Sequence, residues 1–360
     1  MFRSAGRTGL FILFLSVCNR NITYTQEYIH LKDTSDFIRF FHFTDNDSLD
    51  YNRPLHIILT LDIKRFYKVK REEEYQPAVL SFYTGDSTRI DMNVRLRSRG
   101  EFRKDYCVMP PVRISFKSSG DTAEASIPSL KMVTHCKNTA LFEKYLLKEY
   151  LVYRLYNLIT DYSYRVRLLR IDYVDSRNKV KPMTRYAFII EPDKYMEKRF
   201  NARLVEKNIY RMYQVNHDVM NRLALFQFMI GNTDWHVTLG HNIRLGIFPD
   251  SLNKRPVPVP FDFDYSGLVD AFYALPHESL GIKSVRERVF MGPCIDETQF
   301  GELFAEFNEY RDLFTRMVSG FEILDHDLRR GILYYLDEFY EVIGNRNVAR
   351  AEIIDMCKKQ

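Results

Sequence analysis

The sequence predicts an α+β protein with a β-rich first half and a mainly helical second half. Alternation of apolar and polar side chains, which is typical of half-buried strands, covers residues 55–63, 79–83, 89–97 and 112–116. Apolar residues three or four positions apart, which are typical of helices, cover residues 142–159, 215–230, 297–319 and 321–343. A chain of 360 residues with 46% hydrophobic content buries a sizeable core, and its length suggests two domains or one two-lobed unit.

The overall charge is mildly basic and mixed in sign. The chain has 52 lysines and arginines against 47 aspartates and glutamates, which gives a net charge of +5. This balance suits a phosphate-bearing ligand such as a nucleotide, and we expect no nucleic-acid partner. Beyond the N-terminus no stretch is apolar enough for a membrane helix, so we expect no transmembrane span.

The N-terminus resembles a secretory signal peptide. Two arginines precede a short apolar run at residues 9–18, and polar residues follow it. We therefore assign residues 1–20 to a signal peptide and residues 21–52 to a linker or extension. The protein is expected to be exported to the periplasm or cell surface, and the alternative is a buried N-terminal helix. Lipidation at Cys18 is a further alternative, although Val17 replaces the small residue expected before it.

The five cysteines show no C-x-x-C spacing, so a zinc site is not expected. Export permits disulfides. Cys107 and Cys136 flank segments that are predicted to be neighbouring strands, and we expect them to pair. The alternative is two buried free thiols.

Polar side chains gather between residues 230 and 267, after a predicted helix and at the ends of two predicted strands. They are Asn232, Asp234, His236, His241, Asn242, Asp262 and Asp264. Loops at the ends of rigid elements are common positions for functional groups. Two carboxylates and an asparagine are the groups that phosphoryl transfer uses to orient a hydroxyl and to hold magnesium.

The order N-x-D-x-H, a later asparagine and an apolar-D-x-D resembles the catalytic and metal-binding loops of the spore-coat protein H (CotH) kinase family. The likeness is strongest over residues 230–267 and weaker over residues 90–195. It implies a two-lobed protein-kinase-like fold, with a β-rich N-lobe at residues 53–192 and a helical C-lobe at residues 193–360. Eight positions separate Asp234 from Asn242, where the usual kinase spacing is about five.

The resemblance also implies a mechanism that uses ATP and Mg²⁺ or Mn²⁺. Asp234 would orient the acceptor hydroxyl. Asn242 and Asp262 would hold the metal ion, and Asp264 would be a second ligand or support. The expected acceptor is a serine or threonine of another exported protein. The oligomeric state is not predicted.

Three further residues are candidates for nucleotide binding. Glu149 lies in the apolar stripe of a predicted helix, where a buried carboxylate needs a partner. Lys131 lies in a short strand 18 residues upstream, and a strand lysine paired with a helix glutamate holds the α- and β-phosphates in kinases. The alternative partner of Glu149 is Arg154 or Arg165. Residues 97–104 form a basic segment that contains Gly100, and the CotH relatives carry a similar R-x-R-G stretch. Its Arg99 would contact phosphates, unless the segment is only a solvated hairpin loop.

Two other functions remain open from the sequence. His236 and His241 with Asp262 and Asp264 would suit a metal-dependent hydrolase that uses a bound water. Alternatively, the chain is an inactive kinase-like module that binds a partner at the cell surface. A kinase requires magnesium and ATP, a hydrolase requires the histidines, and a binding module requires neither.

Overall fold

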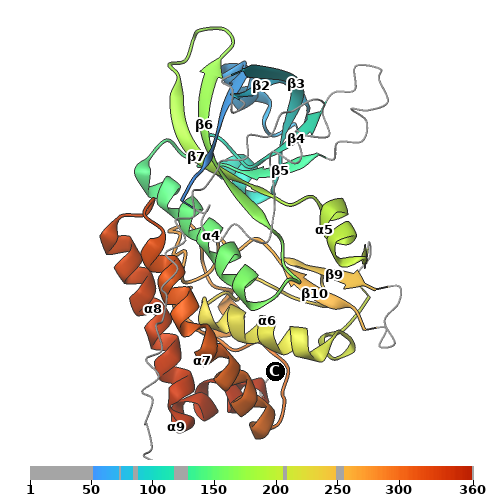
Figure 1. The fold of residues 1–360 in the computed structure, drawn as a ribbon, viewed down its shortest axis with the longest axis vertical. Coiled ribbons are helices and arrows are strands. Elements are labelled where there is room, and N and C mark those ends of the chain that lie inside the picture. Colours follow the sequence, from blue (N-terminus) through green and yellow to red (C-terminus); the bar gives the residue numbers. More distant parts are fainter. Residues whose placement is uncertain are drawn as a thin grey trace, which may run out of the picture.

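The structure is a computed structural model that describes residues 52–72, 74–83, 88–116, 129–205, 209–248 and 255–358 (Figure 1). The predicted signal peptide, Cys18 and nearly all of the predicted linker lie outside these residues. Among the described residues, no helix has both the length and the apolar character needed to cross a membrane.

Seven strands form a closed barrel in the upper part of Figure 1, in the order β1-β2-β3-β4-β5-β7-β6. Their bounds are Leu55–Leu61 (β1), Gln76–Tyr83 (β2), Arg89–Ser98 (β3), Val112–Phe116 (β4), Leu130–Val133 (β5), Val166–Asp175 (β6) and Met183–Ile190 (β7). The parallel pairing of β1 with β6 closes the barrel, and the other neighbours are antiparallel. A short helix, α2 (Ile63–Val69), follows β1, and another, α3 (Phe102–Tyr106), lies between β3 and β4.

The barrel interior is filled by the apolar residues that alternate along each strand. In β4, for example, Val112, Ile114 and Phe116 are buried, whereas Arg113 and Ser115 are partly exposed. Alternate side chains of a strand point to opposite faces, so this pattern places one face of every strand in a common core.

The remaining elements are mainly helical and lie below the barrel in Figure 1. The helices are α4 (Ala140–Ile159), α5 (Asp193–Phe200), α6 (His217–Met229), α7 (Glu297–Gly320), α8 (His326–Gly344), α9 (Arg346–Ala349) and α10 (Asp355–Cys357). A small sheet in the order β10-β9-β8 joins them, with bounds Val257–Pro260, Ile243–Ile247 and Arg203–Leu204. Side-chain caps mark the helix starts: Asn216 accepts from Val219 N at α6, and Asp296 accepts from Gln299 N at α7.

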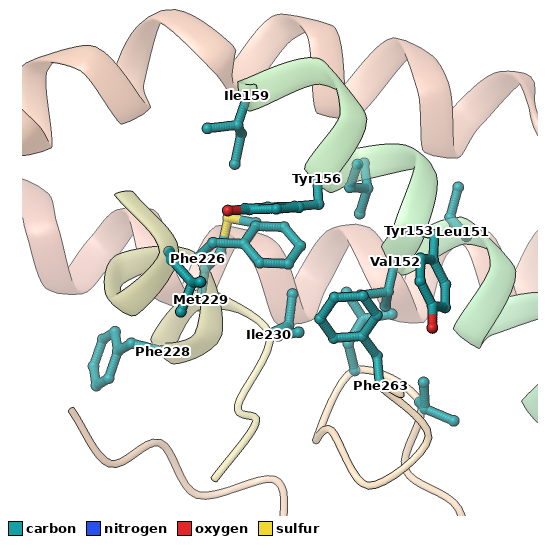
Figure 2. Packing of buried hydrophobic residues seen from close by; sticks show 14 of the residues in the cluster. Leu151, Val152, Tyr153, Tyr156, Ile159, Phe226, Phe228, Met229, Ile230 and Phe263 are labelled. Carbon is teal, nitrogen blue, oxygen red and sulfur yellow. The ribbon is translucent and has the colours of Figure 1, made fainter. Parts of the chain in front are cut away.

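Helix α4 joins the barrel and the helices through one continuous core. Its Tyr156 packs on Phe226 of α6, and its Tyr153 packs on Phe263, both with ring centroids 4.7 Å apart (Figure 2). The same helix contacts Phe188 of β7. The apolar surface of α4 is therefore used on several sides, and it stabilises both parts of the molecule.

The α+β class is confirmed, but the prediction of a two-lobed protein-kinase-like fold is wrong. Strands β1 to β7 close into a barrel, and the molecule is a barrel-containing α+β fold. Alternation along a strand reports which face is buried and does not report which strand lies beside it. The pairing of Leu55 with Leu169, far apart in the chain, was therefore not visible in the sequence.

Two disulfides link the described residues. Cys107 pairs with Cys136, as predicted. Cys294 pairs with Cys357, which ties the segment before α7 to the end of the described chain. The second pairing was not predicted, because its cysteines are 63 positions apart and belong to no spacing motif.

Candidate functional site

The candidate site forms where the loop after α6 meets the loop after β10. Gly231, which has φ of +64°, ends α6, and a side chain at this position would collide with the hydroxyl of Tyr335. The backbone N–H of Gly267 donates to Gly231 O (3.0 Å), and that of Leu268 donates to Ile230 O (3.0 Å). These bonds hold the two loops side by side.

Asp234 is held in the first loop by hydrogen bonds to its carboxylate and backbone. Asn242 donates through Nδ2 to Asp234 O (2.7 Å) and to Oδ2 (2.9 Å). His241 Nε2 lies 2.7 Å from Asp234 Oδ1, and the Asp234 N–H donates to Asn232 Oδ1 (3.0 Å). The Asp234 side chain stays 36% exposed, so an incoming hydroxyl can reach it. Asn242 thus orients Asp234 directly.

The second loop brings Asp262 and Asp264 to Glu149 of α4. One ligand atom from each of these three residues lies within 4.8 Å of the others. We call these three residues the carboxylate cluster. Asp262 adopts a left-handed backbone (φ 63°), and its N–H donates to the hydroxyl of Tyr153 on α4 (2.8 Å). That bond ties the D-x-D segment to the helix that carries Glu149.

Arg103 of α3 lies between two members of the carboxylate cluster. Its Nη2 is 2.5 Å from Asp264 Oδ2 and 3.2 Å from Glu149 Oε2. The Tyr273 hydroxyl also donates to Asp264 Oδ2 (3.0 Å). Burial would lower the pKa of Arg103, but Asp264, Tyr273 and Glu149 outweigh burial and raise it well above its usual value. The sequence placed Arg103 in the basic segment at residues 97–104, whose cations were expected to cover phosphates, and did not predict its contact with these carboxylates.

The carboxylate cluster has more negative charge than its protein partners neutralise. Glu149 is 1% exposed, and its Oε1 accepts no hydrogen bond from the described residues. Burial raises the pKa of Glu149 to about 8, against the opposing effect of Arg103. Burial and the neighbouring charge of Asp264 also raise the pKa of Asp262. A buried carboxylate with an unpaired oxygen is costly unless a cation or proton joins it.

The predicted ion pair between Lys131 and Glu149 is not formed. Lys131 Nζ lies 2.8 Å from Asp193 Oδ1, which also accepts from the Tyr164 hydroxyl (3.0 Å). The prediction was wrong because Arg103 of α3 takes the place beside Glu149. Burial lowers the pKa of Lys131, against the raising effect of Asp193.

Arg99 acts electrostatically on both Lys131 and the carboxylate cluster. Its charge lowers the pKa of Lys131, after the larger effects of burial and Asp193. It also lowers the pKa of Asp262, where burial and Asp264 act in the opposite direction. Arg244 likewise lowers the pKa of Lys131 as a smaller contribution. Lys131 lies in β5 and Arg99 directly follows β3, so both come from the barrel, whereas Arg244 lies in β9 of the small sheet. Arg99 and Arg244 both act on Lys131, and an anion between these cations would be attracted by all three.

The histidines occupy a different position from the carboxylate cluster. His236 and His241 pair with each other through their backbones, with N···O distances of 2.9 and 3.0 Å. His236 Nδ1 accepts from Leu239 N (3.2 Å). Among the described residues, neither histidine belongs to the group that could hold a metal ion. The set of His236, His241, Asp262 and Asp264 is thus not gathered around one ion position.

A pocket of about 430 Å³ opens beside Asp234. Its lining combines apolar and polar groups: Thr233, Asp234, Tyr265, Leu275, Pro276, His277, Glu278 and Val285. Leu275 is 75% exposed at its edge. We call this pocket the acceptor pocket, because a hydroxyl-bearing side chain that entered it would meet Asp234.

The carboxylate cluster fits a divalent cation. Magnesium and manganese prefer oxygen ligands such as carboxylates. When a cation displaces their protons, the three residues supply three negative charges, and Arg103 is the cation in direct contact with two of them. Glu149 Oε1 has no hydrogen-bond partner among the described residues. Glu149, Asp262 and Asp264 are the residues that would hold the ion.

Comparison with known proteins does not assign the chain to a family. No protein-family model matches the chain, and no curated protein matches its sequence. The function must therefore be argued from the geometry of the site.

Proposed function

We propose that the protein is a phosphotransferase that uses magnesium or manganese and ATP to phosphorylate a hydroxyl of another exported protein. The observation that carries this proposal is the carboxylate cluster, in which three carboxyl groups share the guanidinium of Arg103 and Glu149 keeps an unpaired buried oxygen. Asp234 stands in the adjacent loop, and the barrel contributes Lys131 of β5 and Arg99, which directly follows β3. Metal-binding carboxylates, a hydroxyl-orienting carboxylate and phosphate-binding cations are the groups that phosphoryl transfer requires.

The proposed roles follow from the positions of the side chains. Asp262, Asp264 and Glu149 would hold the metal ion, which supplies positive charge to the phosphate oxygens when it is bound. Arg99 and Lys131 would bind the phosphates. The electrostatic effect of Arg99 on both Lys131 and Asp262 supports this, although Lys131 is oriented by Asp193 and not by Glu149.

Asp234 would orient the acceptor hydroxyl and take its proton. Asn242 and His241 hold two different oxygens of its carboxylate, so the side chain is oriented before the substrate arrives. Its exposure and its position in the lining of the acceptor pocket give a hydroxyl access. The hydroxyl of a serine or threonine on a protein surface is the acceptor that we propose.

We also propose that the loops at residues 230–267 are related to those of the CotH kinase family and that the protein is exported. The first proposal rests on the order of Asp234, Asn242, Asp262 and Asp264. The second is supported by two disulfides, since disulfides persist in oxidising compartments.

The test is label transfer from γ-labelled ATP to the protein itself or to an exported-protein mixture, with Mg²⁺ or Mn²⁺ present. Asp262→Asn and Asp264→Asn remove charge from the carboxylate cluster with little change in shape, and we expect both to abolish transfer. Asp337→Asn is the matched control, because Asp337 is an exposed α8 carboxylate paired with Arg311 (2.9 Å), away from the cluster.

Labelling by the parent chain and Asp337→Asn, but by neither cluster variant, would support the proposal. Equal labelling by all four proteins would point to a contaminating kinase and contradict it. No labelling, together with no magnesium-dependent ATP binding, would leave the non-catalytic binding module.

A further inference from the structure

Arg103 is held beside the carboxylate cluster by covalent and aromatic contacts of α3. Cys107 directly follows this five-residue helix, and its disulfide with Cys136 anchors the helix end. The backbone also joins here, because Met109 N donates to Cys136 O (2.9 Å). A helix of this length is not stable alone, so these attachments hold it in place.

Aromatic rings secure the other side of α3. Phe102 and Tyr106 stack on each other with ring centroids 5.0 Å apart. Tyr106 also lies 6.0 Å from Phe142 of α4 and 5.6 Å from Tyr273, whose hydroxyl donates to Asp264. The rings around α3 thus connect Arg103 with α4, which carries Glu149, and, through Tyr273, with Asp264 in the loop after β10.

We propose that Arg103 makes the carboxylate cluster prefer a divalent over a trivalent cation, and that the Cys107–Cys136 disulfide holds Arg103 in the position that this preference requires. This inference rests on the cation site of the proposed function. Arg103 acts through Glu149 and Asp264 and is therefore a positioning and selectivity residue.

The argument is electrostatic. When ionised, the cluster carries three negative charges, and the guanidinium neutralises one of them. The remaining excess of two matches a divalent cation. Without Arg103 the excess rises to three, and a trivalent cation gains more from this change than a divalent cation, because Coulomb energy scales with the product of the charges. The ratio of the two affinities therefore reports the guanidinium, whereas a general loosening of the site weakens both ions.

The test is competitive binding of Tb³⁺ and Mn²⁺ to the full chain at one pH, measured by terbium luminescence and its displacement. For Arg103→Met and Arg103→Gln we expect the affinity ratio of Tb³⁺ to Mn²⁺ to rise by about tenfold or more. Arg103→Lys keeps the charge and should stay within about twofold of the parent. Far-UV circular dichroism checks that each variant is folded, and the two uncharged variants provide independent measurements.

The disulfide is tested by a matched pair of double variants. Cys107→Ser with Cys136→Ser should raise the ratio in the same direction as Arg103→Gln, because α3 loses its anchor. Cys294→Ser with Cys357→Ser removes the other disulfide and should leave the ratio unchanged.

An unchanged ratio in both uncharged Arg103 variants would overturn the inference while leaving the cation site intact. An unchanged ratio in the Cys107 and Cys136 variant would overturn the role of the disulfide. If the parent chain binds neither ion, the cation site of the proposed function is itself wrong. These results are distinguishable, since the assay needs no ATP and no phosphate transfer.

Discussion

Glu149 and Glu191 are two buried glutamates that lie beside arginines and differ in how completely they are paired. Their exposures are 1% and 2%. Arg199 donates to both oxygens of Glu191, from Nε to Oε1 (3.0 Å) and from Nη2 to Oε2 (2.6 Å). The Arg165 N–H adds a further bond to Oε2 (3.2 Å). Glu191 therefore has the complete set of partners that a buried charge needs.

Glu149 has no such set. It shares Arg103 with Asp264, and its Oε1 has no hydrogen-bond partner among the described residues. The comparison teaches that burial of a carboxylate does not by itself indicate function. Complete pairing indicates a structural role, whereas a missing partner indicates a place for a ligand.

A third carboxylate, Asp234, extends the comparison to an exposed and oriented group. For Asp234→Asn we expect label transfer from ATP to fall by about 100-fold or more, because the amide cannot accept the proton of the hydroxyl. Stability should change by less than about 0.5 kcal/mol, because the side chain is partly exposed. Label transfer and urea unfolding measure the two effects. Full activity in this variant would remove Asp234 from the proposed mechanism.

Breaking the ion pair between Glu191 and Arg199 should lower the stability of the protein and leave cation binding by the carboxylate cluster unchanged. We expect Glu191→Gln to lower the free energy of unfolding by about 3 kcal/mol, because the largely buried Arg199 would lose the charge of its carboxylate partner. Urea denaturation at neutral pH measures this change. Cation binding per folded molecule should match the parent chain. A loss below about 1 kcal/mol would mean that complete pairing is not what stabilises this region.

His135 tests whether an unpaired buried atom alone marks a site. Its Nδ1 has no partner among the described residues, and burial lowers its pKa from 6.5 to about 4. Because the unfolded chain binds the proton more readily, stability should fall as pH drops from about 6.5 towards 4, by about 2 kcal/mol at pH 4.5. Urea unfolding of the parent and His135→Gln at pH 7.5 and 4.5 measures how much of the acid loss of stability comes from His135.

The expected result at His135 is a smaller acid loss in the variant and equal cation binding at neutral pH. The same acid loss in both proteins would contradict the burial argument. Weaker cation binding in His135→Gln would show that an unpaired atom outside the carboxylate cluster also acts on the site.

Substitution of the incompletely paired Glu149 should change stability less than substitution of the fully paired Glu191. Burial raises the pKa of Glu149 to about 8, so without metal ions this side chain is largely a neutral carboxyl group at pH 7. Glu149→Gln then replaces one neutral polar group with another, while Arg103 keeps Asp264 as its partner. We expect the unfolding free energy, measured without added metal ions, to change by less than about 1 kcal/mol. A loss comparable to that of Glu191→Gln would show that Glu149 is a structural residue.

The sequence predicted the α+β class, most strand positions, the Cys107–Cys136 disulfide and the loops that carry Asp234, Asp262 and Asp264. These features depend on local patterns, which a single sequence displays. The sequence also indicated that Glu149 is buried on a helix and needs a cationic partner. The structure places Glu149 with Asp262 and Asp264.

The sequence did not predict the features that depend on distant contacts. Barrel closure through β1 and β6 has no local signature, and it overturned the two-lobed fold. The partner of Glu149 is Arg103 and not Lys131, because the packing of α3 decides which cation reaches α4. Arg103 lies in a basic segment and Lys131 in an apolar strand, and neither local sequence shows which of the two cations contacts Glu149. Only the three-dimensional arrangement distinguishes them.

The most direct test of the carboxylate cluster is the binding of Mn²⁺, measured by electron paramagnetic resonance, to the parent chain, Glu149→Gln and Glu191→Gln. The account predicts one tight site in the parent and in folded Glu191→Gln, and a loss of affinity of at least about tenfold in Glu149→Gln. Equal binding by both variants, or no site in the parent chain, would contradict it.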